Sequence, residues 1–259
     1  MIDLLIALKE KFNVLEVKAE FEAEGTRLDE AIRLKEIVDN AGLGLMIKIG
    51  GAEAIRDIFD AQLLDVSGLV APMIESPYAL RKYLDAIETF VPKELQNNIK
   101  FGVNIETIQA YSNLESIFKE RGIRRLSMIT VGRVDLCLSL GMSRNDINSD
   151  RIYQITKDIC SLAKHFHFQT TIGGGIATEA LPFIKRLGRA KLLDRYETRK
   201  IVFGIPKTFK KAAQGILMAN EFELLWLENK RNYYNAIYQE DSKRIAMLKK
   251  RLVLGRKIK

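Results

Sequence analysis

Short apolar runs alternate with helix-type patterns along most of the chain. Seven runs have the length and composition of strands: Val14–Ala19, Leu45–Ile49, Gly68–Ile74, Lys100–Glu106, Leu126–Val131, Gln169–Gly175 and Lys200–Gly204. Between them, apolar residues recur at the spacing of amphipathic helices. Strand alternating with helix in this way predicts βα units around a parallel sheet.

The predicted fold class is α/β, a TIM (β/α)8-type barrel over residues 1–207. Such a barrel takes about 250 residues, and the chain has 259. The eighth strand has no obvious pattern. We expect it within Lys191–Asp194, unless the first strand of the barrel is the one that is missing.

Residues 208–259 form a second segment with a different character. Its apolar residues lie at helical spacings and are interrupted by Asp241: Tyr234, Ile237, Tyr238, Ile245, Leu248 and Leu252. This pattern predicts one long amphipathic C-terminal helix with a basic opposite face. We expect the helix to pack on the barrel or on a neighbouring subunit, so that the protein is a homo-oligomer. A helix that lies on a membrane or binds RNA is the alternative, with no further feature in its favour.

The charge of the chain is concentrated in this C-terminal segment. The net charge is +8, and the residues from Lys207 onward hold 13 Lys or Arg against 5 Asp or Glu. The barrel body is therefore near neutral, which argues against a nucleic-acid-binding surface on it. No apolar run reaches the roughly 18 residues that span a bilayer. The N-terminus lacks the basic region and cleavage site of a signal peptide, so we expect a cytoplasmic protein without a membrane partner.

Two carboxylates stand at the ends of neighbouring predicted strands. Glu106 ends the fourth run, and Asp135 follows the fifth. An unpaired charge is costly to bury, so these side chains are not core residues. In βα barrels the active site lies at the C-terminal ends of the strands, where side chains from several strands meet. Two carboxylates at one rim suit a hard divalent cation. A pair of unrelated rim residues is the equally weighted alternative.

Other polar residues lie at the same predicted rim: Lys18, Glu20, Lys48, Glu75 and Asn104. Lys48 sits inside an apolar run, where an unpaired ammonium would be costly. It either holds an anionic group of a substrate or forms an internal ion pair with an acid of a neighbouring strand. The same two alternatives apply to Lys18, and a Schiff-base role for either lysine is a further option.

Three motifs together resemble a known family. Val70-Ala-Pro-Met-Ile-Glu, Asn104-Ile-Glu-Thr and Gly132-Arg-Val-Asp-Leu-Cys-Leu-Ser-Leu-Gly occur in this order. They resemble the HpcH/HpaI aldolase and citrate lyase beta-subunit superfamily, whose fold is a phosphoenolpyruvate/pyruvate-type (β/α)8 barrel. The resemblance implies that Glu106 and Asp135 bind a metal, Mg²⁺ or Mn²⁺, and that backbone amides at Val134 and Asp135 bind a substrate carboxylate.

The chain departs from the family pattern at two places. Lys48 stands where the family has an arginine that grips the substrate; lysine keeps the charge and loses the bidentate fork. The histidine base of the aldolase branch has no counterpart in residues 18–24. Lys18 and Glu20 are the candidates to replace it, unless the reaction follows the citrate-lyase branch.

The resemblance implies a metal-dependent carbon–carbon lyase or aldolase. Its substrate would be a 2-oxo acid or a citryl-, malyl- or other acyl-CoA-type molecule. Catalytic roles would fall to Lys48, Lys18 and Glu20, and substrate binding to Lys48, Val134, Asp135 and Asn104. The alternative from another class is a non-catalytic barrel that binds a small organic acid or scaffolds a complex.

Overall fold

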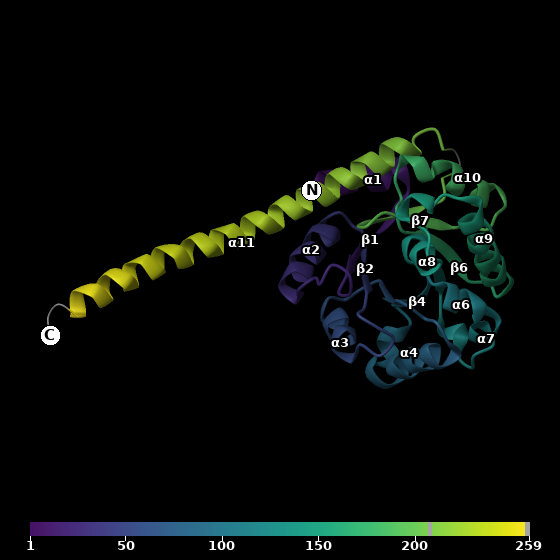
Figure 1. Ribbon diagram of the computed structural model, residues 1–259, viewed down its shortest axis with the longest axis horizontal. Helices are drawn as coiled ribbons and strands as arrows, with labels where there is room; N and C mark the ends of the chain where they lie inside the picture. The colour runs from purple at the N-terminus through teal and green to yellow at the C-terminus, as the bar shows by residue number, and fades with distance from the viewer. Residues whose placement is uncertain (207–208, 257–259) are drawn as a thin grey trace.

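Eight strands form a closed barrel in the order β1 to β8, with helices around it (Figure 1). A computed structural model describes residues 1–206 and 209–256, with side chains as far as residue 253. The strands are β1 (Val14–Glu20), β2 (Gly44–Lys48), β3 (Gly68–Ala71), β4 (Lys100–Ile105), β5 (Met128–Gly132), β6 (Gln169–Gly173), β7 (Arg195–Glu197) and β8 (Ile201–Gly204). The prediction of an α/β barrel with an added C-terminal helix is confirmed.

Helices follow most of the strands and cover the outside of the barrel. They are α1 (Ile2–Phe12), α2 (Leu28–Asn40), α3 (Ile55–Leu63), α4 (Pro77–Phe90), α5 (Lys93–Gln96), α6 (Ile108–Ser112), α7 (Leu114–Phe118), α8 (Arg133–Ser139), α9 (Asp150–His165), α10 (Leu181–Arg189) and α11 (Ala212–Arg256). Among the described residues, no helix combines the length and the apolar character that crossing a bilayer would require.

The last strand departs from the predicted parallel sheet. Strands β1 to β7 are parallel, whereas β8 is antiparallel to both β7 and β1. Only residues 198–200 connect β7 to β8. A parallel crossover needs a dozen or more residues, so this connection can only be a hairpin. The predicted seventh strand is therefore β8. The expectation of a strand within Lys191–Asp194 is wrong, because β7 begins just after that range, at Arg195.

The interior of the barrel is layered along its axis. Near the N-terminal ends of the strands, Arg195 Nη1 lies 2.8 Å from Glu16 Oε2 in a buried ion pair. Above it lies an apolar layer of Met46, Val70, Met128 and Val202. The C-terminal layer is again polar. Side chains alternate along each strand, so the residues between the inward ones face outward.

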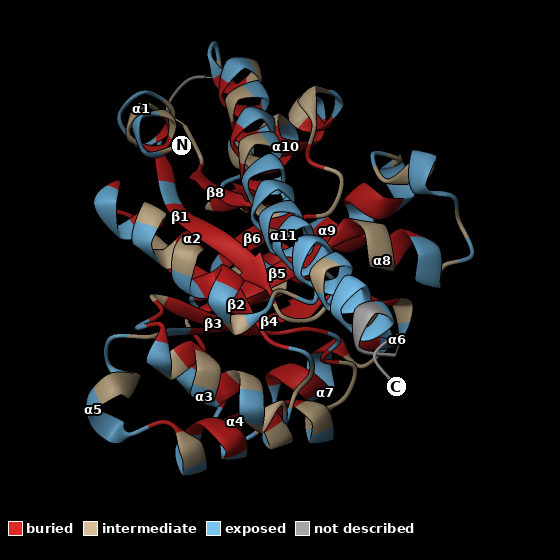
Figure 2. Cartoon of the chain, turned by 90° about the vertical axis from the view of Figure 1, so that its left-hand side faces the viewer, coloured by how far each residue is buried: buried red, intermediate tan, exposed pale blue. Residues whose placement is uncertain are grey.

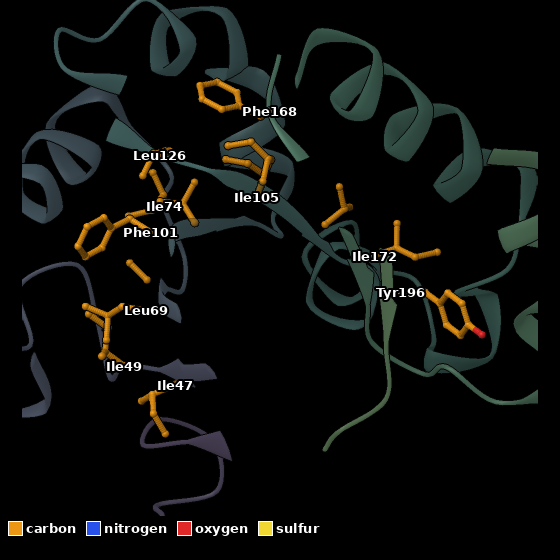
Figure 3. Packing of buried hydrophobic residues seen from close by; sticks show 14 of the residues in the cluster. Ile47, Ile49, Leu69, Ile74, Phe101, Ile105, Leu126, Phe168, Ile172 and Tyr196 are labelled. Atoms are coloured by element: carbon orange, nitrogen blue, oxygen red, sulfur yellow. The ribbon is translucent and has the colours of Figure 1, made fainter. Parts of the chain in front are cut away.

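The outward-facing residues form the main hydrophobic core between the strands and the helices. Ile47, Leu69, Phe101 and Ile105 belong to it and point away from the barrel axis (Figure 3). These residues are buried, and the aliphatic and aromatic side chains bury most of the apolar area of the fold. The inward-facing polar side chains at the C-terminal end of the barrel are not part of this core.

Helix α11 has two distinct halves. Its first turns bury Ile216, Ala219, Phe222 and Trp226 against the body. Up to Tyr234 the helix also lies along α2, where the Tyr234 hydroxyl donates to Glu30 Oε1 at 2.6 Å. Beyond this point the helix leaves the barrel, and its described side chains are exposed except for the half-buried Met247 (Figures 1 and 2). The expected boundary between residues 207 and 208 lies outside the described residues, and the division into barrel and extension stays a prediction.

Candidate active site

The C-terminal ends of the strands open into a cavity of about 590 Å³. All seven residues that the sequence assigned to a site line it: Lys18, Glu20, Lys48, Asn104, Glu106, Val134 and Asp135. Glu75 is the exception among the rim residues. It is not part of the cavity lining, because its Oε1 accepts a hydrogen bond from Thr107 Oγ1 at 2.6 Å outside it.

Glu106 is held rigidly just beyond β4. Its side chain is buried, with Oε1 accepting from the Met73 backbone amide at 3.0 Å and Oε2 from Asn104 Nδ2 at 2.9 Å. The carboxylate passes directly over Gly132, where a Cβ would lie 2.2 Å from Oε2. Gly132 therefore provides the space that this carboxylate occupies.

Asp135 lies in the first turn of α8, past the end of β5, and is half-buried. Burial raises the pKa of Glu106, and the nearby charge of Asp135 adds to this effect, while Lys48 opposes it. The described residues contain no group of three or more His, Cys, Asp or Glu side chains arranged for a metal. Two carboxylates suffice for Mg²⁺, which usually keeps several waters and binds one or two carboxylates together with its substrate.

The two lysines of the rim lie in a chain of ion pairs. Lys18 Nζ lies 2.5 Å from Glu197 Oε1 and 3.1 Å from Glu20 Oε1. Lys48 Nζ lies 2.6 Å from Glu22 Oε2 and 3.6 Å from Glu20 Oε2. The internal ion pair that the sequence left open for Lys48 is thus present.

These ion pairs fix the charges of both lysines. Burial alone would lower the pKa of Lys18, but Glu197 and Glu20 outweigh it and raise that pKa above its usual range. Burial also opposes the charge of Lys48, and Glu20 and Glu22 again raise its pKa. Both side chains are ammonium ions at neutral pH, which disfavours them as bases or as Schiff-base nucleophiles. The pKa of Glu20 is lowered, because the lysines and Arg199 outweigh its burial.

Arg133 is a buried cation beneath the site with no carboxylate partner among the described residues. It is fully buried, and its guanidinium donates to the carbonyl oxygens of residues 173, 174, 175 and 147 and to Asn148 Oδ1. These bonds tie the glycine loop after β6 to the start of α8. Gly174 consequently packs against the Val134 amide, where a Cβ would lie 2.7 Å from the nitrogen.

Several residues that line the cavity were not predicted from the sequence. Glu197 pairs with Lys18 through one oxygen, and its Oε2 has no hydrogen-bond partner among the described residues. Its strand has only three residues, so the strand pattern is short, although the alternation of Arg195, Tyr196 and Glu197 is a usable signal. Helix α11 contributes Asn220 and Glu223 to the lining. Asn220 and Glu223 could have been noticed as two polar residues spaced three apart within a largely apolar run.

Comparison with known proteins places the chain in a family. A model of the HpcH/HpaI aldolase/citrate lyase family matches residues 26–173, more than half of the chain. A search among curated protein sequences found no match.

The fold is also similar to solved structures. An HpcH/HpaI aldolase/citrate lyase family protein from Burkholderia cenocepacia J2315 superposes with a TM-score of 0.60 at 16% identity, over 88% of this chain and 91% of that one. An HpcH/HpaI aldolase from Desulfitobacterium hafniense DCB-2 has a TM-score of 0.60 at 14% identity, over 86% and 87%. Citrate synthase SbnG has a TM-score of 0.60 at 14% identity, over 89% of each chain. At these identities the structural likeness shows the fold. The family match shows more: this chain belongs to the HpcH/HpaI aldolase/citrate lyase family, a family of carbon–carbon lyases.

Proposed function

We propose that this protein is a metal-dependent carbon–carbon lyase or aldolase that acts on a 2-oxo acid or on a citryl- or malyl-type substrate. One observation carries the proposal. Glu106, Asp135 and Lys48 line a single cavity at the C-terminal end of the barrel of a chain from this family.

Glu106 and Asp135 are the residues that would hold Mg²⁺ or Mn²⁺. Members of the family generally depend on a divalent metal. The electrostatics of the cavity fit a cation, because six carboxylates and four basic side chains line it among the described residues. A cation would also offset the burial and the charge of Asp135, which together raise the pKa of Glu106. Bound there, the ion would supply Lewis-acid polarisation of a carbonyl oxygen.

The substrate would be held by groups on both sides of these carboxylates. Lys48 would place its ammonium beside the keto oxygen, where negative charge develops during carbon–carbon bond cleavage. The backbone amides of Val134 and Asp135 would receive the substrate carboxylate. Asn104 has its amide nitrogen on Glu106, so its carbonyl oxygen remains for a water or a substrate hydroxyl.

Lys18 and Glu20 would contribute to the reaction through the charges that they place near the substrate. Lys18 is a permanent cation on Glu197 and Glu20, and Glu20 bridges the two rim lysines. This arrangement sets the position of Lys48 and adds positive potential near the developing oxyanion. The proton-transfer group of the reaction is therefore a different residue.

One observation favours the non-catalytic alternative. Lys48 is already paired with Glu22, at 2.6 Å, so a substrate must compete for it. A barrel that only binds a small organic acid would show oxalate binding without catalytic turnover of pyruvate.

Metal-dependent hydrogen exchange of pyruvate separates these functions. The lyase proposal predicts that the wild type exchanges the methyl protons of pyruvate in D₂O with Mg²⁺, loses the activity in EDTA, and loses it in Glu106→Ala. Equal exchange in both proteins, or no exchange in the wild type, would defeat the lyase proposal.

The outer half of α11 would assemble the protein into a homo-oligomer. Tyr238, Ile245, Leu248 and Leu252 are exposed there. They repeat at spacings of seven and three or four residues, the pattern of a helix that packs against another helix.

A further inference from the structure

Helix α11 supplies one wall of the cavity. Asn220 and Glu223, three residues apart on one side of the helix, line it together with the barrel residues. The neighbouring Ala219, Phe222 and Trp226 are buried against the body, so this part of the helix is fixed in place. The C-terminal helix is therefore part of the candidate active site as well as an extension of the barrel.

The carboxylates that line the cavity differ in what they already bind. Glu20, Glu22 and Glu197 are ion-paired to Lys18 or Lys48. Glu106 accepts two hydrogen bonds and lies near Asp135, with which it is proposed to hold the cation. Among the described residues, Glu223 has no hydrogen bond and no ion pair within 4 Å. Glu106 and Asp135 are proposed to hold the cation. Among the other described carboxylates that line the cavity, Glu223 is the one that no side chain or backbone group binds.

We propose that Glu223 is the general acid–base residue of this site, because no histidine base of the aldolase type is present in residues 18–24; this rests on the lyase function proposed above. In the direction of enolate formation, the Glu223 carboxylate removes a proton from the methyl carbon of the bound 2-oxo acid. The electron pair of the C–H bond becomes the new carbon–carbon double bond. The carbonyl π pair moves onto the carbonyl oxygen beside the Lys48 ammonium. In the reverse direction, the Glu223 carboxylic acid returns the proton to the carbon.

The surroundings of Glu223 suit this role. It is half-buried, and four charged groups face it: Lys200 and Arg199 from the β7–β8 hairpin, Glu24 from the loop after β1, and Glu20 from β1. Burial raises the pKa of Glu223, and the two acids add to this effect against the two basic groups. A carboxyl whose pKa moves toward neutrality is a better proton carrier than one held ionised by a lysine.

The test uses the full-length protein and a matched control on the same helix. Glu223→Gln removes the acid–base group, and Glu221→Gln makes the same charge change at an exposed position two residues away. Each variant is measured for Mg²⁺-dependent exchange of the pyruvate methyl protons, for binding of oxalate with Mg²⁺, and for its melting temperature.

We expect Glu223→Gln to lose at least about 100-fold in exchange rate, with oxalate affinity and melting temperature close to the wild type. Glu221→Gln should match the wild type in all three. The wild-type rate should rise with pH as Glu223 ionises, and this dependence should disappear in Glu223→Gln. Wild-type exchange in Glu223→Gln, or a loss of oxalate binding equal to the loss of exchange, would overturn the assignment. A wild type that binds oxalate but exchanges no protons would instead overturn the lyase function itself.

Discussion

Oε2 of Glu106 lies 2.2 Å from the point where a Cβ of residue 132 would be. Glu106 directly follows β4 and Gly132 ends β5, and these two strands pair in parallel. A glycine at position 132 is therefore a requirement of the carboxylate's position. The backbone there has φ −84°, which any residue can adopt, so the requirement is one of space.

Gly132→Ala should displace Glu106 and weaken divalent-cation binding at least tenfold, because a methyl group would occupy the place of Oε2. Mn²⁺ titration followed by electron paramagnetic resonance measures this. Gly51→Ala is the matched control, since nothing lies within 4 Å of a Cβ at Gly51. If both variants bind Mn²⁺ like the wild type, Glu106 is not a ligand in this position.

Glu106→Gln should raise the melting temperature of the metal-free protein at pH 7. The pKa of Glu106 is raised in the folded state by burial and by Asp135. Its contribution to stability is thus full below its ordinary pKa and is lost as pH rises through the raised value. The neutral amide avoids that loss, so the gain should be present at pH 7 and absent near pH 4. Calorimetry at the two pH values tests the sign, and a destabilised variant at pH 7 would contradict it.

Arg133→Met should cost about 3 kcal/mol of unfolding free energy, because buried carbonyl oxygens of the glycine loop lose their donor. It should also raise the KM for a 2-oxo acid more than it lowers kcat, since the loop positions the amides of α8. Urea unfolding and steady-state kinetics measure the two effects. Arg56→Met, at a side chain that is 89% exposed, should change neither. Unchanged stability in Arg133→Met would show that the hydrogen bonds from Arg133 to the glycine loop do not stabilise the fold.

Removal of residues 236–259 should reduce the oligomeric mass in light scattering while leaving oxalate binding intact. This truncation keeps Trp226, Glu223 and the Tyr234–Glu30 hydrogen bond.

The exposed apolar stripe is flanked by Arg244, Lys249 and Arg251, so like charges oppose self-association. Higher salt should therefore strengthen the assembly of the full chain. An unchanged mass after truncation would remove the outer helix as the assembly surface.

The barrel was predictable because its outward-facing residues keep the strand signal. Leu45 and Ile47, for example, belong to the core whatever lies inside the barrel. Strand β7 was not predicted, because it has only three residues. Arg195 and Glu197 point into the barrel, so Tyr196 is the one apolar residue of this strand in the core. The reversal of β8 was implicit in the short connection from β7, which is too short for a crossover.

The candidate site was predictable where the chemistry follows the strand ends. Glu106 and Asp135 stand at neighbouring strand ends, so topology alone brings them together. The pairing of Lys48 with Glu22 depends on how the loop after β1 folds back. The presence of Glu223 depends on how α11 packs across the rim, more than 80 residues later in the sequence than Asp135. Neither follows from local patterns.

We propose that Glu106 and Asp135 together hold a divalent cation, and a titration with Mn²⁺ measures this binding without any assumption about the substrate. In electron paramagnetic resonance titrations, the wild type should bind one Mn²⁺ per chain. Glu106→Gln and Asp135→Asn should each lose this site, and Glu115→Gln, at an exposed carboxylate on α7, should keep it. If both site variants bind Mn²⁺ with the affinity of the wild type, Glu106 and Asp135 are not the ligands of the cation.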